Sequence, residues 1–333
     1  MPRGRHRDFA LFAILILLLM VSFLVVRVPM GRDRTLTSFV VKKGTRTTTV
    51  ALLLKRDHRV RSEYFFLLCS LLLHRGRVVA GEYELSESMS TLDIARKMAD
   101  GDRKVYTLRI VEGYNLYTIS EVIERAGIMD AGAFLRLAGN ADFLKRLAIP
   151  SDSLEGYLAP ETYFYSKEID VDEFLGKIVQ RTLRFFDKED MRLRMQELGM
   201  NAFQVISLAS IIEKEAKLEG EKRIISAVFH NRLRMGMSLD ADPTVIYGCG
   251  GFNRDLTKAD LAARTPYNTY HLKGLPKGPI CSPSRSSIMA ALYPEGSDVL
   301  YFVSRNDGSH VFSGTMEEQN HFVAIYQRKK GKK

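Results

Sequence analysis

The stretch that most constrains the fold of this chain is residues 207–216, which read Ser-Leu-Ala-Ser-Ile-Ile-Glu-Lys-Glu-Ala. Apolar residues recur around it at the i, i+3, i+4 spacing of one helix face. They are Val205, Leu208, Ala209, Ile212 and Ala216. The pattern therefore predicts a helix over residues 202–217 that packs one apolar face against the rest of the protein.

Two carboxylates, Glu213 and Glu215, border this apolar face. At about 100° per residue, Glu215 lies roughly 65° from the centre of the stripe and Glu213 roughly 95° away on the other border. A carboxyl flanked by Leu208, Ile211 and Ile212 is partly desolvated, which raises its pKa as a general acid near neutral pH requires. Nearby Lys214 and Lys217 act in the opposite direction and lower the pKa, and the sequence does not decide which effect is larger. The same spacing also fits an ordinary amphipathic helix with solvated glutamates, so the helix alone leaves both interpretations open.

A series of motifs follows this helix. They are Asn231-Arg232-Leu233, residues 239–248 (Leu-Asp-Ala-Asp-Pro-Thr-Val-Ile-Tyr-Gly), residues 266–270 (Pro-Tyr-Asn-Thr-Tyr), residues 274–280 (Gly-Leu-Pro-Lys-Gly-Pro-Ile) and Tyr301-Phe302-Val303. In this order they resemble the YceG-like, or MltG, family of membrane-anchored endolytic murein transglycosylases, and the resemblance extends to Tyr326. The catalytic glutamate of that family is the second of its Glu-Lys-Glu pair, which is Glu215 here.

The resemblance implies a lytic transglycosylase that cleaves the MurNAc-β-1,4-GlcNAc bond of nascent peptidoglycan strands and terminates their elongation. A single glutamate protonates the glycosidic oxygen and then takes the proton of the C6 hydroxyl that attacks C1. The product is a 1,6-anhydro-MurNAc end, and no water is consumed. Intramolecular attack explains why a second carboxylate is not obligatory, although most glycosidases use two. The implied partners are glycan strands and peptidoglycan synthases, and no cofactor is expected.

The motifs also supply candidate substrate-binding residues. In residues 155–165 (Glu-Gly-Tyr-Leu-Ala-Pro-Glu-Thr-Tyr-Phe-Tyr), Glu161 is a candidate site carboxylate and Tyr163 a candidate for stacking on a sugar, although aromatic rows are more often part of a core. The other candidates are Glu213, Asn231, Asp242, Thr244, Tyr247, Tyr267, Asn268 and Tyr270.

Two departures from the family pattern concern the residues that support the acid. Many members have Thr or Ser where Ala216 follows Glu215, and the motif commonly written Glu-His-Asn reads Glu318-Gln319-Asn320 here. Neither change removes the acid, but both put its supporting residues in doubt.

The N-terminus carries an uncharged run, residues 9–26, that is about long enough to cross a bilayer. Three arginines precede it, and no small-x-small cleavage site follows it. A cleaved signal peptide is the competing interpretation. We expect residues 1–8 in the cytoplasm, an uncleaved single-pass anchor at 9–28 in the inner membrane, and a periplasmic remainder, an orientation that rests mainly on the resemblance.

The expected fold class is α+β. A LysM-like α/β module is expected at 38–105, a connecting module at 106–150, a mainly helical catalytic domain with a small β-sheet at 151–327, and a basic tail at 328–333. LysM modules elsewhere bind N-acetylglucosamine glycans, but a plain spacer remains equally open. We further expect one helix over 171–198, and a hairpin of strands 300–303 and 310–312 that turns at residues 306–308, Asn-Asp-Gly.

Charge and composition exclude some classes of function. The net charge of +10 fits an anionic polymer or surface, or simply charge spread over solvated faces. The chain has no zinc-finger spacing, no Gly-rich phosphate loop and no Trp, so nucleic acid is not an expected partner. No Cys/His cluster has metal-ligand spacing, so no metal is predicted. The alternative to an enzyme is a non-catalytic, glycan-binding membrane scaffold of the cell-wall synthesis machinery.

Overall fold

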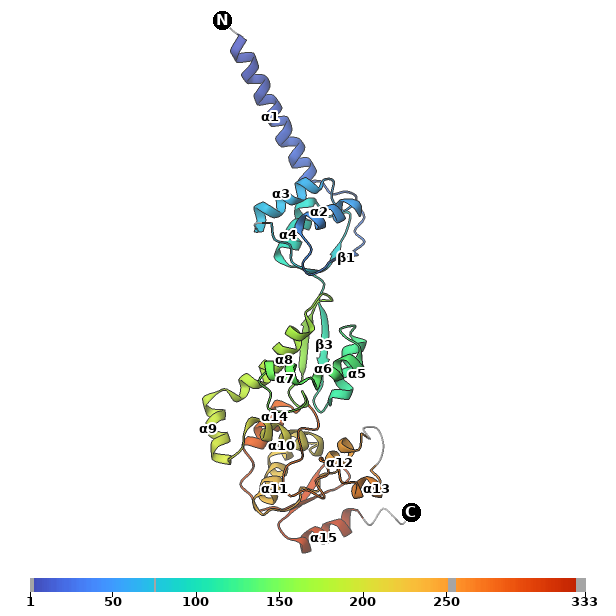
Figure 1. The fold of residues 1–333 in the computed structure, drawn as a ribbon, viewed down its shortest axis with the longest axis vertical. Helices are drawn as coiled ribbons and strands as arrows, with labels where there is room; N and C mark the ends of the chain where they lie inside the picture. Colours follow the sequence, from blue (N-terminus) through green and yellow to red (C-terminus); the bar gives the residue numbers. More distant parts are fainter. Residues whose placement is uncertain (1–2, 75, 251–255, 328–333) are drawn as a thin grey trace. The chain divides into compact units, whose positions relative to one another are not determined.

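The chain is a mixed α/β protein with small two-stranded sheets, and a computed structural model describes residues 3–74, 76–250 and 256–327 (Figure 1). It divides into two compact units. The first runs to Thr107 and includes Phe164–Asp170, and the second holds Leu108–Tyr163 and the chain from Val171 onward. The chain passes between the units through β3 (Tyr106–Ile110) and β4 (Glu161–Tyr165), which pair with each other. The predicted basic tail, 328–333, lies outside the described residues.

The first unit is a small two-layer module. Strands β1 (Thr37–Val41) and β2 (Gly81–Leu85) pair antiparallel, with Phe39 opposite Tyr83 in the core. Helices α2 (Thr47–Arg56), α3 (Glu63–His74) and α4 (Thr91–Asp100) contribute the other buried residues of that core. The LysM-like assignment of residues 38–105 and its glycan-binding role stay predictions.

The predicted transmembrane helix is wrong. The N-terminal segment forms helix α1 (Arg3–Arg27), but no helix among the described residues is long and apolar enough to cross a membrane. The prediction rested on an uncharged run of 18 residues, residues 9–26. A span needs about 20 apolar residues, so this run was near the lower limit of length from the start.

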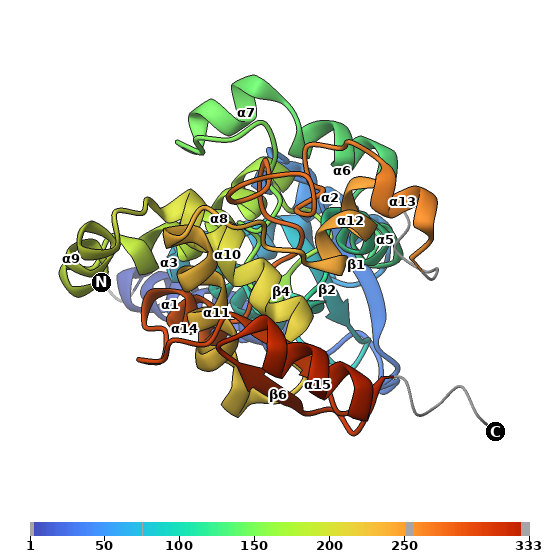
Figure 2. The same cartoon turned by 90° about the horizontal axis from the view of Figure 1, so that it is seen from below.

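The second unit is built around α10 (Ala202–Glu215), which packs against α11 (Lys222–Arg234), α12 (Asp242–Gly248) and α14 (Arg285–Leu292) (Figure 2). Every residue from Val205 to Ile212 is buried, including Ser207 and Ser210. These two hydroxyls donate to backbone carbonyls of the same helix, at 2.8 and 2.7 Å, so their burial leaves no donor unpaired. The helix is thus enclosed on all sides in its middle, not on one face as its spacing predicted.

The remaining helices of this unit surround that centre. They are α5 (Leu116–Arg125), α6 (Ala131–Ala138), α7 (Ala141–Arg146), α8 (Val171–Phe186), α9 (Glu189–Leu198) and α13 (Lys258–Ala262), with a 3₁₀ turn at Glu219–Glu221. The single helix predicted over 171–198 is wrong, because α8 and α9 are separate. The buried stripe of α8 ends at Phe186, and the next positions of that stripe are Glu189 and Asp190. These acidic residues instead occupy the first turn of α9, where the helix dipole favours them.

The predicted C-terminal hairpin is confirmed. Strands β5 (Tyr301–Ser304) and β6 (His310–Ser313) pair antiparallel, and Asn306 adopts the positive φ of 67° that its turn requires. Helix α15 (Met316–Tyr326) packs against both strands. The Gln319 side chain donates to the Phe302 carbonyl and accepts from the Ser313 hydroxyl, both at 3.2 Å. Gln319 therefore ties α15 to the hairpin.

Candidate active site

Glu215 occupies the last position of α10. The helix stops there because Ala216 is extended, with φ −77° and ψ 116°. The Glu215 side chain is half-buried, and its carboxyl has no hydrogen-bond donor within the described part of the chain. Burial, followed by the negative charge of Asp242, raises the pKa of Glu215 to about 8. A carboxyl with this pKa is mostly protonated at neutral pH and can act as a proton donor.

Two side chains from other segments share the surroundings of Glu215. Asp242 begins α12 and is exposed to solvent. The hydroxyl of Tyr270, from the loop that follows α13, donates to Asp242 Oδ1 at 2.7 Å. Burial, that hydrogen bond and the negative charges nearby, including that of Glu215, raise the pKa of Tyr270. Three of the predicted residues, Glu215, Asp242 and Tyr270, therefore come together in the fold.

The carboxylate of Glu213, two residues earlier, accepts several hydrogen bonds. One oxygen accepts from the Ser284 backbone N–H at 2.9 Å, from the Ser284 hydroxyl, and from the Ser287 hydroxyl at 2.6 Å. The ammonium group of Lys222, whose side chain is 8% exposed, lies 3.6 Å away. These contacts fasten the end of α10 to the first turn of α14, so Glu213 serves the packing of the two helices.

A third carboxyl, Glu155, lies in the core of this unit and was given no role by the sequence. Glu155 is 2% exposed, and its Oε2 accepts from the Leu116 N–H at 3.0 Å and from the Tyr247 hydroxyl at 2.8 Å. Its Oε1 is buried without a partner among the described residues. Burial raises the pKa of Glu155 to about 7 despite these hydrogen bonds. Only the packing of α5 and α12 creates this environment, and no local spacing signals it.

The backbone after Glu155 is held tightly. Gly156 has a φ of +80°, and a Cβ added there would lie 2.6 Å from Pro279 Cβ and 2.7 Å from Ile206 Cγ2. Only glycine fits such a position.

Two tyrosine rings pack together near Glu155. The centroid of the Tyr247 ring lies 4.8 Å from that of the Tyr267 ring. Two further predicted residues, Tyr247 and Tyr267, thus belong to the surroundings of Glu155.

The other candidates with amide or hydroxyl groups hold the local backbone. Buried Asn231 donates to two carbonyls of the loop before β5, both at 2.8 Å. Asn268 donates to carbonyls in and after α13, the shortest at 2.7 Å. The Thr244 and Thr269 hydroxyls share a hydrogen bond of 2.8 Å, and Tyr163 donates to the Ala159 carbonyl at 2.7 Å. These four predicted residues are engaged in fixing loops and are not brought to Glu215 by any of these contacts.

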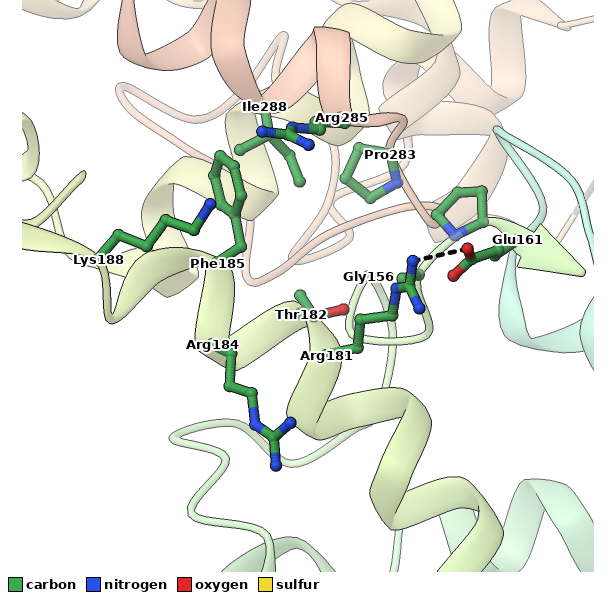
Figure 3. A pocket seen from close by; sticks show the side chains of 12 residues that line it. Gly156, Glu161, Arg181, Thr182, Arg184, Phe185, Lys188, Pro283, Arg285 and Ile288 are labelled. Carbon is green, nitrogen blue, oxygen red and sulfur yellow. Dashed lines mark hydrogen bonds and ion pairs between the residues drawn. The ribbon is translucent and has the colours of Figure 1, made fainter. Parts of the chain in front are cut away.

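Glu161 lies in a different part of the unit. Its carboxylate pairs with the Arg181 guanidinium at 2.6 Å, at the edge of a cavity of about 380 Å³ (Figure 3). In the described part of the chain, no group of three or more His, Cys, Asp and Glu side chains could hold a metal ion.

Comparison with known proteins gives matches over most of the chain. The model of the YceG-like family matches residues 39–325. An endolytic murein transglycosylase of Bacillus subtilis is 28% identical over 322 residues, covering 92% of this chain and 89% of the relative. One from Streptococcus pneumoniae is 26% identical, covering 87% of this chain and 58% of its own length. The crystal structure of a YceG-like protein from Listeria monocytogenes is similar at a TM-score of 0.61 and 30% identity, covering 87% of this chain and 99% of that one.

Proposed function

This chain belongs to the YceG-like family, and we propose that it is an endolytic murein transglycosylase with Glu215 as its catalytic acid and base. The assignment rests on the contrast between Glu215 and Glu213 at the C-terminal end of α10. Glu215 is the carboxyl whose pKa is raised to about 8 and that accepts no hydrogen bond within the described residues, whereas one oxygen of Glu213 accepts from Ser284 and Ser287. The relatives that carry the name of this activity align over nearly the whole chain.

The first chemical step uses the protonated form of Glu215. Its proton passes to the glycosidic oxygen between MurNAc and GlcNAc while the bond from that oxygen to C1 of MurNAc breaks. Because the pKa of about 8 lies close to neutral pH, the acid form is available at the start. The carboxylate left behind is basic enough to accept a proton in the next step.

The second step returns the proton. The C6 hydroxyl of the same MurNAc attacks C1, and the Glu215 carboxylate takes the proton of that hydroxyl. One C–O bond has broken and one has formed, and the enzyme recovers its starting protonation. Attack within one sugar replaces a water-activating base, since the nucleophile is already held beside C1.

Asp242 supplies the negative charge that the transition state needs. Positive charge develops at C1 and the ring oxygen as the glycosidic bond breaks, and a fixed carboxylate stabilises it. The Tyr270 hydroxyl, 2.7 Å from Asp242 Oδ1, holds that carboxylate in place. We assign Asp242 as electrostatic stabiliser and Tyr270 as its positioning residue.

The location and role follow from the proposed substrate. Murein lies outside the cytoplasm, so we propose that the second unit acts there. Termination of nascent glycan strands beside peptidoglycan synthases is the role that an endolytic cleavage of this kind supports.

The deciding experiment is a digest of purified glycan strands in ¹⁸O-water, followed by mass spectrometry of the released ends. We expect 1,6-anhydro-MurNAc ends that carry no oxygen from the solvent. Reducing ends that carry ¹⁸O, beyond slow exchange, would show that water is the nucleophile and that the enzyme is a hydrolase. Retention of the strands without cleavage would indicate the glycan-binding scaffold instead.

A further inference from the structure

The proposed reaction assigns no role to the cavity beside Glu161 in the second unit. It has a volume of about 380 Å³ and lies between the end of α8, the segment 156–161 and the start of α14 (Figure 3). A volume of this order accommodates a group of one or two amino-acid residues. The residues that line it include Glu161 but not Glu215.

The charge of this cavity is positive. Arg181 is neutralised by Glu161 at 2.6 Å. Lys188 and Arg285 also line the cavity, and neither has an acidic partner within the described residues. Both lie over the ring of Phe185, with Lys188 Nζ 5.8 Å and Arg285 Cζ 5.5 Å from its centroid. Both cations thus share one aromatic ring (Figure 3), and two cations without acidic partners favour an anion beside them.

Apart from Thr182 and Arg184, the rest of the lining is apolar. Ala159, Pro160, Pro283 and Ile288 give the cavity an apolar wall. A phosphate or pyrophosphate needs a dense set of N–H donors around it, and such a wall does not supply one. A short peptide end fits better, because its methyl groups contact the apolar wall and its carboxylate reaches Arg285 and Lys188.

The cavity is linked to α10 through Ser284. Pro283 and Arg285 line the cavity and flank Ser284. The Ser284 N–H donates to Glu213, two residues before Glu215. A ligand seated in the cavity therefore contacts the segment that fastens the end of α10.

We propose that this cavity binds the free carboxylate end of a murein stem peptide, with Arg285 and Lys188 as its ion-pair partners. The inference rests on the proposed function, since stem peptides are part of murein and end in D-alanine. It adds a peptide subsite to an enzyme whose cleavage chemistry involves only the glycan. Cleavage is then faster on strands that keep their peptides than on strands stripped of them.

The first test measures binding without cleavage. N-acetyl-D-alanyl-D-alanine, its C-terminal amide and inorganic pyrophosphate are titrated separately into the full chain by calorimetry. We expect the free acid to bind and the amide to bind at least tenfold more weakly, a difference of 1.4 kcal/mol. Equal binding of acid and amide, or tighter binding of pyrophosphate than of the peptide acid, would overturn the assignment. Because no glycan is cleaved, this result is independent of the proposed reaction.

The second test uses the double variant Lys188→Gln/Arg285→Gln on two substrates. We expect kcat/KM to fall about five- to tenfold on peptide-bearing strands and to stay unchanged on strands freed of peptide by an amidase. The matched control Lys177→Gln/Arg192→Gln removes two cations from α8 and α9 outside the cavity and should change neither rate. Equal losses on both substrates, or no loss on either, would overturn the peptide subsite. A wild-type chain that cleaves neither substrate would refute the proposed function instead, and the titration would still decide the cavity.

Discussion

Glu213 and Glu215 leave the same helix two residues apart and meet opposite surroundings. The Glu213 carboxylate accepts from Ser284 and Ser287 and lies 3.6 Å from Lys222 Nζ. The Glu215 carboxyl accepts no hydrogen bond within the described chain, and burial and Asp242 raise its pKa to about 8. The last turn of one helix thus holds a carboxylate fixed for structure and a carboxyl kept ready for proton transfer.

The difference arises from where the helix ends. Glu213 still lies in the ordered last turn, where the first turn of α14 presents serine hydroxyls and a backbone N–H. Glu215 is the final helical residue, and the chain turns away at Ala216 before any donor reaches its side chain. A hydroxyl at position 216 is absent here, so the carboxyl lacks an adjacent donor that would have lowered its pKa.

The largest effect is expected for Glu215→Gln. The amide keeps the shape of the side chain but cannot donate and recover a proton, so activity on glycan strands should fall by about 10² or more. The release of anhydro ends, followed by mass spectrometry, measures the loss. Thermal unfolding should be unchanged or slightly improved near pH 8, because the variant no longer carries a carboxyl that burial disfavours when charged. A variant that keeps more than a tenth of the activity would remove Glu215 from the mechanism.

Glu155→Gln tests the third carboxyl, and its readout is stability. The pKa of Glu155 is about 7 in the fold against an ordinary value of 4.5, so the folded state disfavours its charge. Its contribution to the free energy of unfolding is therefore greatest below pH 4.5, falls as pH rises toward about 7, and is constant above that. At about 1.4 kcal/mol per pH unit, the fall amounts to roughly 3 kcal/mol.

The measurement is urea unfolding of wild type and Glu155→Gln from pH 4.5 to 8. The variant should gain stability relative to wild type across this interval, and since both proteins keep Glu215, the difference isolates Glu155. Glu317→Gln, which removes an exposed carboxylate of α15, controls for the loss of one charge. Parallel curves for wild type and Glu155→Gln would show that Glu155 titrates as it does in the unfolded chain.

Glu213→Gln is expected to act mainly on stability. The amide oxygen can still accept from the serines, but buried Lys222 loses one of its two carboxylate neighbours, at a cost of about 2 kcal/mol. Catalytic activity at a temperature where the variant is folded should fall by less than tenfold. Glu219→Gln removes the other, exposed partner of Lys222 and should cost less than about 1 kcal/mol. If Glu213→Gln is folded but inactive and Glu215→Gln is active, the two roles are reversed.

The sequence predicted those parts of the site whose pattern lies in neighbouring residues, and missed those that depend on contacts between distant segments. Helical spacing located α10 and both of its carboxylates, and Asn-Asp-Gly located the C-terminal hairpin. Spacing could not decide whether burial or nearby lysines would control the pKa of Glu215, because the neighbour that matters, Asp242, comes from another helix. For the same reason Glu155 was missed, since its partners lie on α5 and α12. The transmembrane prediction failed on a different ground, because it relied on the length of an apolar run.

Position in a motif also proved a weak guide to the role of a side chain. Asn231 and Asn268 lie in the motifs that carry the resemblance, yet both are buried and their amides are used on backbone carbonyls. Gln319 was noted as a departure near the acid, but it ties α15 to the hairpin. Such contacts form between segments that are distant in sequence, so only the folded chain separates them from substrate-binding groups.

The smallest expected effect is a displacement of the pH profile in Asp242→Asn, and it tests the coupling that distinguishes Glu215 from Glu213. Burial is the larger cause of the raised pKa of Glu215, and the charge of Asp242 is the second. Removing that charge should lower the pKa of Glu215 while burial keeps it above the ordinary value. Because kcat/KM requires the protonated acid, its decline with rising pH should begin at a lower pH than in wild type. Tyr270→Phe is the matched control, since it removes the hydrogen bond to Asp242 but keeps the charge. The pH at which kcat/KM declines in this variant should stay close to that of wild type.

The value of kcat/KM on the low-pH plateau should also fall in Asp242→Asn, because the carboxylate that stabilises positive charge at C1 is gone. A decline that does not move in Asp242→Asn would mean that the titrating group is not Glu215, and the contrast between the two carboxyls of α10 would then need another explanation.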